Sequence, residues 1–301
     1  MDGCREGTTH RRPASTFLMA PFSNINGTKL RVPKSFSGIL PPSPSDDYFD
    51  YEPLAFHALS LVLTRGEIVY DVGASFGVMS VLIGSLIGPS GRVFSFEPNL
   101  STAARASELF RCNGVSCTLQ TFCVGDVSRE TVVFYAVKGF RSVASTRNPE
   151  ILKFHPDGER IEVPMISLDD FCRSGNPAPG CLKIDVEGSE YLAVNGMKTI
   201  MREHHPDMVI ETHAVEIDGI GGSLRALTDT LAAEGYLLFD IVENRLADPG
   251  LYAETYADRI GNLLASTRLH SAPFLRSCQA ATDKFLSAYR LRSRRGERID
   301  A

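Results

Sequence analysis

The stretch "YDVGASFGV", Tyr70 to Val78, decides the fold of this 301-residue chain. Asp71 ends an apolar run, Gly73 and Gly77 follow it, and apolar residues at helical spacing come next. An apolar strand that turns through glycines into a helix is typical of the first β–α unit of an open α/β sheet. In such sheets the ligand binds beyond the carboxyl ends of the strands, where this loop falls.

Strand and helix patterns continue to alternate after this loop, which predicts a mostly parallel sheet covered by helices on both faces. Two further apolar segments predict an antiparallel pair or insertion, and two more a terminal hairpin-like pair. The predicted core strands are 66–73, 91–98, 117–126, 181–188 and 207–213, the inserted pair is 130–137 and 159–168, and the terminal pair is 236–243 and 261–266.

The chain divides into three predicted parts. Residues 1–53 form an N-terminal arm, whose proline- and acid-rich segment 39–53 is a candidate lid over the substrate. Residues 54–270 form the main α/β domain, beginning with a helix over 54–64, and residues 271–301 form a basic amphipathic helix and tail.

The composition narrows the class of protein. The chain is 43% hydrophobic and 22% charged, as soluble globular proteins are, and its net charge of −5 argues against nucleic acid as the main partner. Its 7 cysteines form no CxxC pair, which indicates a reducing compartment. No secretory pattern or long apolar stretch stands out, so a cytoplasmic protein is expected, and a homo-oligomer is left open.

The loop favours one cofactor over another. A dinucleotide loop reads GxGxxG because a pyrophosphate needs bare backbone N–H groups, whereas this loop reads DxGxxxG. A carboxylate at Asp71 would repel a pyrophosphate but attract a ligand ammonium group. The pattern therefore favours S-adenosylmethionine, and the alternative is a tight turn without a ligand.

Acidic residues after the next two strands support a nucleoside. Glu97 closes "VFSFE" and can accept hydrogen bonds from both ribose hydroxyls, which suits S-adenosylmethionine and NAD alike. Asp126 is a candidate for the adenine amino group, or equally a turn residue. Ala74 and Pro98, the neighbours of these motifs, complete the predicted donor-binding set together with Gly73, Gly77 and Asp185.

A second signature is "LKIDVEGSEYLAVNGM", Leu182 to Met197. Asp185 ends a predicted strand at the same sheet edge as Asp71, and Glu187 and Glu190 follow closely. For Glu187 and Glu190 the alternative role is that of a helix N-terminal acid stabilised by the helix dipole.

At this point the chain resembles the FkbM-type S-adenosylmethionine-dependent methyltransferases. The resemblance implies a Rossmann-like class I methyltransferase fold, a seven-stranded sheet whose last strand is antiparallel. It also implies O-methylation of a hydroxyl on a sugar, a glycolipid or a polyketide-type natural product, with Asp71, Gly73, Gly77 and Glu97 binding the donor. Asp185 would border the methyl-transfer site. The matching stretches are "VYDVGASFGVMSVLIG", "VFSFEPN", "CVGD", "SLDDF", "LKIDVEGSEYLAVNGM" and "IETH".

The catalytic residues are predicted from strand ends. An alcohol needs a base at neutral pH, and His213 is the leading candidate because it ends the fifth strand near Asp185. Glu211 lies two residues earlier, on the same strand face. The alternatives are an ordinary loop histidine, or a Mg²⁺ or Mn²⁺ site made by Asp185, Glu211 and His213.

Other functions remain open at this stage. The acceptor is expected to be a small molecule with a hydroxyl, but an N-methyltransferase fits the same motifs. An NAD-dependent oxidoreductase is disfavoured by the missing GxGxxG and by Asp71. A non-catalytic S-adenosylmethionine-binding module is disfavoured by the retained acids.

Overall fold

The computed structural model describes residues 22–36, 51–136 and 158–294, with short pieces at 40, 48–49, 145–146, 149 and 156. Most of the predicted lid and the first 21 residues lie outside this part of the chain, as do the side chains after residue 290.

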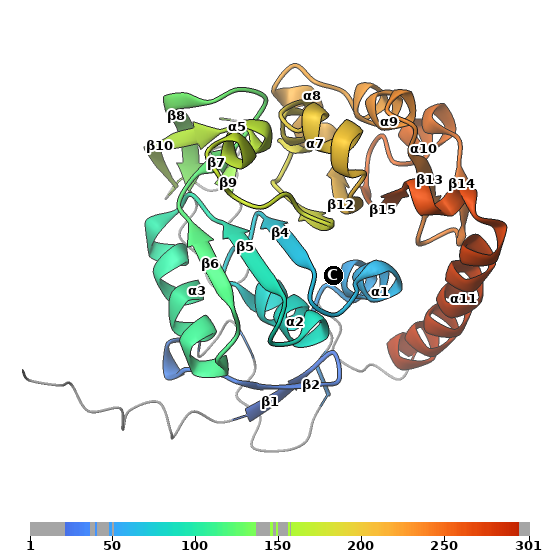
Figure 1. Ribbon diagram of the computed structural model, residues 1–301, viewed down its shortest axis with the longest axis horizontal. Helices are drawn as coiled ribbons and strands as arrows, with labels where there is room; N and C mark the ends of the chain where they lie inside the picture. Colours follow the sequence, from blue (N-terminus) through green and yellow to red (C-terminus); the bar gives the residue numbers. More distant parts are fainter. Residues whose placement is uncertain are drawn as a thin grey trace, which may run out of the picture.

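The main sheet has eight strands in the order β14-β13-β15-β12-β11-β4-β5-β6 (Figure 1). From β6 to β12 neighbouring strands are parallel, and β15 is antiparallel to both β12 and β13. This confirms the predicted mostly parallel α/β sheet and its antiparallel last strand. The predicted number of seven was one too low, because the short edge strand β14 adds to β13. The strands are β4 (Ile68–Val72), β5 (Arg92–Phe96), β6 (Cys117–Gln120), β11 (Cys181–Ile184), β12 (Asp207–His213), β13 (Leu237–Asp240), β14 (Arg245–Ala247) and β15 (Ile260–Ser266).

Helices cover both faces of this sheet, each over its own apolar core. In Figure 1, α1 to α3 lie below the strands and α7 to α9 above them. One core takes side chains from α1 (Pro53–Val62), α2 (Val78–Ile87), α3 (Leu100–Asn113) and α11 (Ala272–Arg294). The other takes them from α5 (Leu168–Arg173), α6 (Glu190–Asn195), α7 (Lys198–His204), α8 (Ala214–Gly219), α9 (Leu224–Ala233) and α10 (Pro249–Thr255).

Strand alternation places polar side chains on a single face of the sheet. In β4, Val69 packs in the α1–α2 core while Tyr70 and Val72 pack in the opposite core, so Asp71 points to the α1–α2 side. Asp71 stands opposite Ser95 of β5 and Lys183 of β11 in the register. The polar residues at the strand ends therefore meet on the α1–α2 side of the sheet.

A second, four-stranded sheet lies beside the first, in the order β7-β10-β8-β9. The predicted antiparallel pair within it is confirmed by β8 and β10. The predicted strand 117–126 was wrong in its length, because its second half leaves the main sheet as β7 and pairs with β10. The strands are β7 (Cys123–Val124), β8 (Arg129–Ala136), β9 (Ser145–Thr146) and β10 (Glu159–Ile166).

The N-terminal arm begins with the hairpin of β1 (Phe22–Ile25) and β2 (Thr28–Arg31), and β3 (Tyr48–Phe49) pairs with β1. A short 3₁₀ turn, η2 (Lys34–Phe36), follows the hairpin. The Asn26 side chain clips the arm to Tyr51, donating to its carbonyl over 2.7 Å and accepting from its N–H over 2.8 Å. This clip fixes the backbone just before Glu52 and the start of α1.

The C-terminal helix α11 docks onto α1, after the 3₁₀ turn η3 (Thr267–His270). The His57 ring stacks on Phe285 with centroids 4.2 Å apart, and its Nε2 lies 3.0 Å from the Thr282 hydroxyl. Burial lowers the pKa of His57 to about 4, so this contact uses the neutral ring. Within the described residues, no helix is both long and apolar enough to cross a membrane.

Candidate active site

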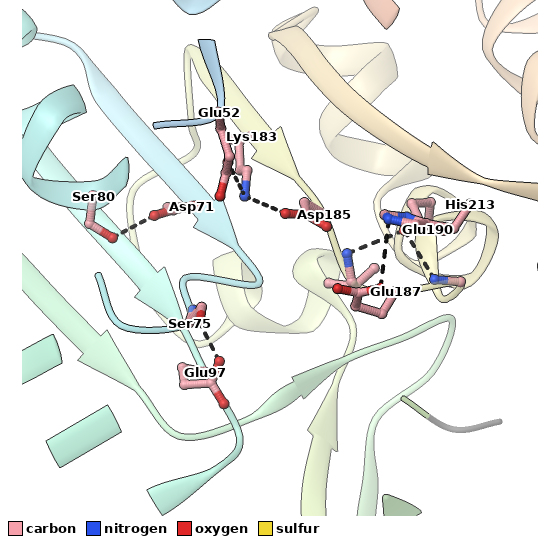
Figure 2. Close-up of polar contacts among 12 residues, drawn as sticks. Glu52, Asp71, Ser75, Ser80, Glu97, Lys183, Asp185, Glu187, Glu190 and His213 are labelled. Atoms are coloured by element: carbon pink, nitrogen blue, oxygen red, sulfur yellow. Dashed lines mark hydrogen bonds and ion pairs between the residues drawn. The ribbon is translucent and has the colours of Figure 1, made fainter. Parts of the chain in front are cut away.

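The candidate site lies at the carboxyl ends of β4, β5, β11 and β12 (Figure 2). It consists of a donor loop after β4, a charged group around Lys183, and a histidine group around His213.

The donor loop runs from Gly73 to Gly77, between β4 and α2, and both glycines have left-handed backbone angles. A Cβ on Gly73 would lie 1.7 Å from the backbone oxygen of Asp185, and one on Gly77 would lie 2.5 Å from the Phe110 ring. The sequence pattern predicts that these glycines allow close approach of a ligand. In the structure they let the loop approach β11 and α3, with Gly73 and Ala74 also donating backbone N–H groups to the Phe96 carbonyl.

Asp71 lies fully beneath the surface. Its Oδ2 accepts a hydrogen bond from the Ser80 hydroxyl, which accepts one from Ser95 over 2.8 Å. Its Oδ1 is buried with no hydrogen-bond partner among the described residues. Burial raises the pKa of Asp71, and the nearby Lys183 opposes that rise. Direct contact between Asp71 and a donor ammonium stays a prediction.

Glu97 has the geometry expected of a ribose ligand. Its two oxygens accept backbone N–H groups from Ser75 over 3.1 Å and from Asn99 over 2.8 Å, which fixes the carboxylate at the strand end. Pro98 is buried between Glu97 and the helix cap Asn99. Burial raises the pKa of Glu97 to about 7. A carboxylate has about four acceptor sites, so two remain for the hydroxyls of a nucleoside, and these residues fit S-adenosylmethionine.

Replacing Glu97 by Ala should weaken the binding of S-adenosylhomocysteine by about 10- to 100-fold, since hydrogen bonds to a charged group contribute about 1.5–3 kcal/mol. Isothermal calorimetry measures this directly. Glu67→Ala is the matched control, because Glu67 also accepts a backbone N–H, that of Thr64 over 2.7 Å, but precedes β4 at the opposite sheet edge. Equal affinities for Glu97→Ala and the wild type would remove Glu97 from the donor site.

Asp126 is placed differently from the prediction. It is half-buried and follows β7 of the second sheet, whereas the prediction put it after the third core strand. Its neighbour Gly125 packs so closely on the end of α6 that a Cβ on Gly196 would lie 2.0 Å from the Gly125 carbonyl oxygen. A contact between Asp126 and adenine stays a prediction.

Lys183 is the cation of the charged group, and Figure 2 shows it between two acids. Its Nζ lies 2.8 Å from Asp185 Oδ2 and 3.3 Å from Glu52 Oε2, and its side chain is only 3% exposed. Burial alone would lower the pKa of Lys183, but Asp185 and Glu52 raise it well above its usual value. Burial alone would raise the pKa of Asp185, but Lys183 and His213 hold it below the usual value. The ammonium therefore stays charged.

Glu211 borders the same group. It lies close to Asp185 and Glu52, and burial together with these two carboxylates raises its pKa to about 8. Burial also raises the pKa of Glu52, which Lys183 partly offsets. Glu211 thus carries a proton through much of the neutral range.

The histidine group is built on Glu190, a residue with no exposed surface. Its Oε1 accepts backbone N–H groups from Val186 over 3.2 Å and Gly188 over 3.1 Å, and lies 2.9 Å from His213 Nδ1. An N–H at Nδ1 that donates to this oxygen leaves Nε2 free for chemistry, as in catalytic carboxylate–histidine pairs. The Nε2 atom lies 3.7 Å from Glu187 Oε2.

The electrostatics of this group favour a charged ring. Burial alone would lower the pKa of His213, but Glu190, Asp185 and Glu187 raise it well above its usual value. Glu187, held in a left-handed conformation, has its pKa raised to about 7, mainly by burial. His213 can therefore take up a proton and hold it as an imidazolium.

A divalent metal fits these residues poorly. The predicted ligands Asp185, Glu211 and His213 do not form a single ligand group among the described residues. The carboxylates of Glu52, Asp185 and Glu211 do gather, yet the Lys183 ammonium already lies against two of them. Asp185, Glu190 and His213 also gather, but there the Nδ1 atom and the carboxylate are bonded to each other. The Lys183 ammonium therefore balances the charge of these acids, in the place where a metal ion would otherwise do so.

The structure places Asp185, Glu211 and His213 at one edge of the sheet, as predicted. It adds Glu52, Lys183 and Glu190, for which the sequence predicts no catalytic role. Lys183 and Glu190 stand inside the second signature, and their alternation with apolar residues in β11 and α6 was the available signal. Glu52 had no local signal, because its contact with Lys183 joins residues far apart in the chain.

The chain is similar to known methyltransferases. The profile of the family described as "Methyltransferase FkbM domain" matches residues 71–238. The 31-O-demethyl-FK506 methyltransferase FkbM of Streptomyces tacrolimicus is 30% identical over 190 residues, which are 55% of this chain and 72% of that protein. The hexuronic acid methyltransferase AglP of Haloferax volcanii is 27% identical over 153 residues, 49% of this chain and 56% of that protein.

A solved structure of the methyltransferase FkbM from Methylobacillus flagellatus KT aligns with 68% of this chain and 44% of its own chain. The identity is 18% and the TM-score 0.43. The chain thus spans less than half of that protein.

Proposed function

The chain belongs to the FkbM family of S-adenosylmethionine-dependent methyltransferases, and from this premise we propose that it methylates a hydroxyl of a small-molecule acceptor. The observation that carries the proposal is the buried pair of Glu190 and His213, 2.9 Å apart, beside Asp185 at the carboxyl edge of the sheet. An alcohol needs such a base more than a neutral amine does.

The acceptor class is proposed from the two relatives. One relative is named as a 31-O-demethyl-FK506 methyltransferase and the other as a hexuronic acid methyltransferase. We propose a sugar, a glycolipid or a polyketide-type natural product as the acceptor.

The residues divide the chemistry between them. S-adenosylmethionine supplies an activated methyl group when bound, and Glu97 and the donor loop would hold it. His213 Nε2 takes the hydroxyl proton as the oxygen attacks, while Glu190 holds Nδ1–H and stabilises the imidazolium that results. Glu187 lies 3.7 Å from Nε2 and Asp185 lies near the ring, and we expect these two residues to keep the ring oriented and the acceptor oxygen within reach.

The charge on His213 depends on what is bound nearby. Three carboxylates favour the imidazolium, which cannot act as a base. A cation bound beside Asp185, the donor's sulfonium included, lowers the pKa of His213 by repulsion. The base is therefore expected to become available only once the donor is in place.

Glu190→Gln should shift the pH dependence of kcat. The rate rises with pH as His213 loses its proton, and Glu190 is the largest of the acids that raise its pKa. The neutral amide should therefore move the rising limb to lower pH, while weaker orientation lowers the plateau by about 10- to 100-fold. The pH profile of kcat from about pH 5 to 10 measures both effects.

Asp218→Asn is the matched control for that profile, since Asp218 is exposed on α8, five residues after His213. This control variant should have the rising limb of its kcat profile at the same pH as the wild type. A Glu190→Gln profile that falls uniformly without moving would assign Glu190 a purely structural role.

Each alternative function predicts a different experimental result. An N-methyltransferase would need no base and should tolerate loss of His213. A non-catalytic binding module would bind S-adenosylhomocysteine without turnover, and an NAD-dependent oxidoreductase would bind NAD. A homo-oligomer, a cytoplasmic location, the absence of nucleic-acid binding and a lid in residues 39–53 remain predictions. Dependence on Mg²⁺ or Mn²⁺ is not proposed, because the Lys183 ammonium already lies against two of the acids.

A further inference from the structure

Asn262 is a buried amide that the proposed mechanism does not use. It lies in β15, is 8% exposed, and its Oδ1 has no hydrogen-bond partner among the described residues. A buried amide oxygen without a hydrogen-bond partner destabilises the folded protein. In a folded protein, a buried polar group of this kind typically makes a hydrogen bond to a ligand or to an ordered water.

The register aims Asn262 at the site. Asn262 stands directly opposite Glu211 in the antiparallel pair of β12 and β15. Directly opposed residues point to the same face with Cβ atoms about 5 Å apart. Leu264, two residues along β15, packs in the α1–α2 core, which places Asn262 on the same face as Lys183.

The position lies beyond the donor loop. From β4 the sheet passes through β11 and β12 before it reaches β15, three steps of about 4.8 Å each, or about 14 Å in all. Glu97, on β5, is one strand farther away. Asn262 therefore faces the part of the site left for the acceptor, on the far side of Asp185 from the donor.

We propose that Asn262 and Glu211 bind a second hydroxyl of the acceptor, next to the one that is methylated. The inference rests on the proposed function. It deepens that function by requiring a polyhydroxylated acceptor, such as a sugar ring, over one with a single hydroxyl. A hydroxyl both donates and accepts, and it therefore matches an amide oxygen that lacks a donor beside a carboxyl group.

The chemistry of Glu211 suits this role. Glu211 stands directly opposite Asn262 across β12 and β15, so its carboxyl group can meet the same hydroxyl while Asn262 Oδ1 accepts the hydroxyl hydrogen. A site that hydrogen-bonds a substrate hydroxyl discriminates strongly against an analogue without that hydroxyl. The buried polar groups of the site then lack a partner.

The first test is independent of the acceptor. Asn262→Leu should leave the melting temperature unchanged or raise it by a few degrees, because it removes an unpartnered polar group at similar volume. Asn113→Leu is the matched control: Asn113 donates to the carbonyls of Arg31 and Leu109 and accepts the Arg31 N–H. That control should lower the melting temperature by several degrees. A loss for Asn262→Leu as large as the control's would overturn the inference.

The second test measures specificity with a panel of methyl hexosides and their monodeoxy analogues. For the accepted sugar, removing one neighbouring hydroxyl should lower the wild-type kcat/KM by about 100-fold or more, and Asn262→Leu should shrink that ratio below about 10-fold. The affinity for S-adenosylhomocysteine should not change.

The outcomes separate the two proposals. Transfer to hydroxyls with equal kcat/KM for sugars and deoxysugars would overturn the second-hydroxyl site and leave the proposed function standing. A wild-type ratio that Asn262→Leu does not change would also overturn it, assigning the discrimination to other residues. Transfer to amines alone would overturn the proposed function and this inference with it.

Discussion

His213→Gln is expected to lower kcat by about 10²- to 10⁴-fold, the range that a positioned general base contributes. The glutamine keeps a polar group of similar size against Glu190 but cannot take up a proton. Because His213 is 5% exposed and belongs to the end of β12, the affinity for S-adenosylhomocysteine should stay close to that of the wild type. Single-turnover kinetics with a saturating donor measure the chemical step.

His204→Gln provides the control, since His204 is exposed at the end of α7, away from the strand ends. It should leave kcat unchanged. A His213→Gln enzyme within about threefold of the wild type would mean that the acceptor needs no base, as expected for an amine.

Lys183→Met is expected to lower the free energy of unfolding by about 3 kcal/mol at neutral pH. Removing one partner of a buried ion pair leaves an uncompensated charge, which costs about 3–5 kcal/mol. Here Asp185 and Glu52 keep side-chain exposures of 18% and 23%, so the lower end of that range applies. Denaturant unfolding followed by circular dichroism measures the change.

The pH dependence of that loss identifies its cause. Without the ammonium, the pKa of Asp185 in the folded protein rises above its unfolded value, and the pKa of Glu52, which is already raised, rises further. A carboxyl group whose pKa is raised in the folded protein destabilises that protein at pH values above the pKa. The destabilisation disappears as the pH falls through the pKa and the group takes up a proton. The deficit of Lys183→Met should therefore shrink from about pH 7 towards about pH 4.

Lys284→Met is the control, because Lys284 is exposed on α11 and its loss should cost little at any pH. A deficit of Lys183→Met that stays constant over the same pH range would instead indicate lost packing of the lysine stem. The explanation of the lost stability by uncompensated charge on Asp185 and Glu52 would then be wrong.

The sheet could be predicted because its strands are locally distinct. The stretches "VYDV", "VFSF", "LKID" and "VIET" are short apolar runs that carry one or two polar residues, and each ends at or next to a glycine, an acid or a histidine at the carboxyl edge. This local pattern is sufficient to assign Asp185 and His213 to one edge of the sheet, where both lie. The pattern failed for strand 117–126, where a continuous run of strand-like residues conceals the change of partner from β5 to β10.

Long-range contacts limited the prediction of the site. Glu52 reaches Lys183 only because its left-handed backbone starts α1 there, and no neighbouring residue indicates that contact. Glu190 could equally have been a helix N-terminal acid, and its bond to His213 depends on the packing of α6 against β12. The position of Asn262 opposite Glu211 depends on the register of β15 on β12, which a single sequence does not determine.

Transfer of a ¹³C-labelled methyl group from S-adenosylmethionine to a mixed panel of sugars and amines, followed by NMR, tests the central claim most directly. The account predicts a new O-methyl carbon on a sugar, present with the wild type and with His204→Gln and lost with His213→Gln. An N-methyl carbon, or an O-methyl carbon formed equally well by His213→Gln, would contradict it.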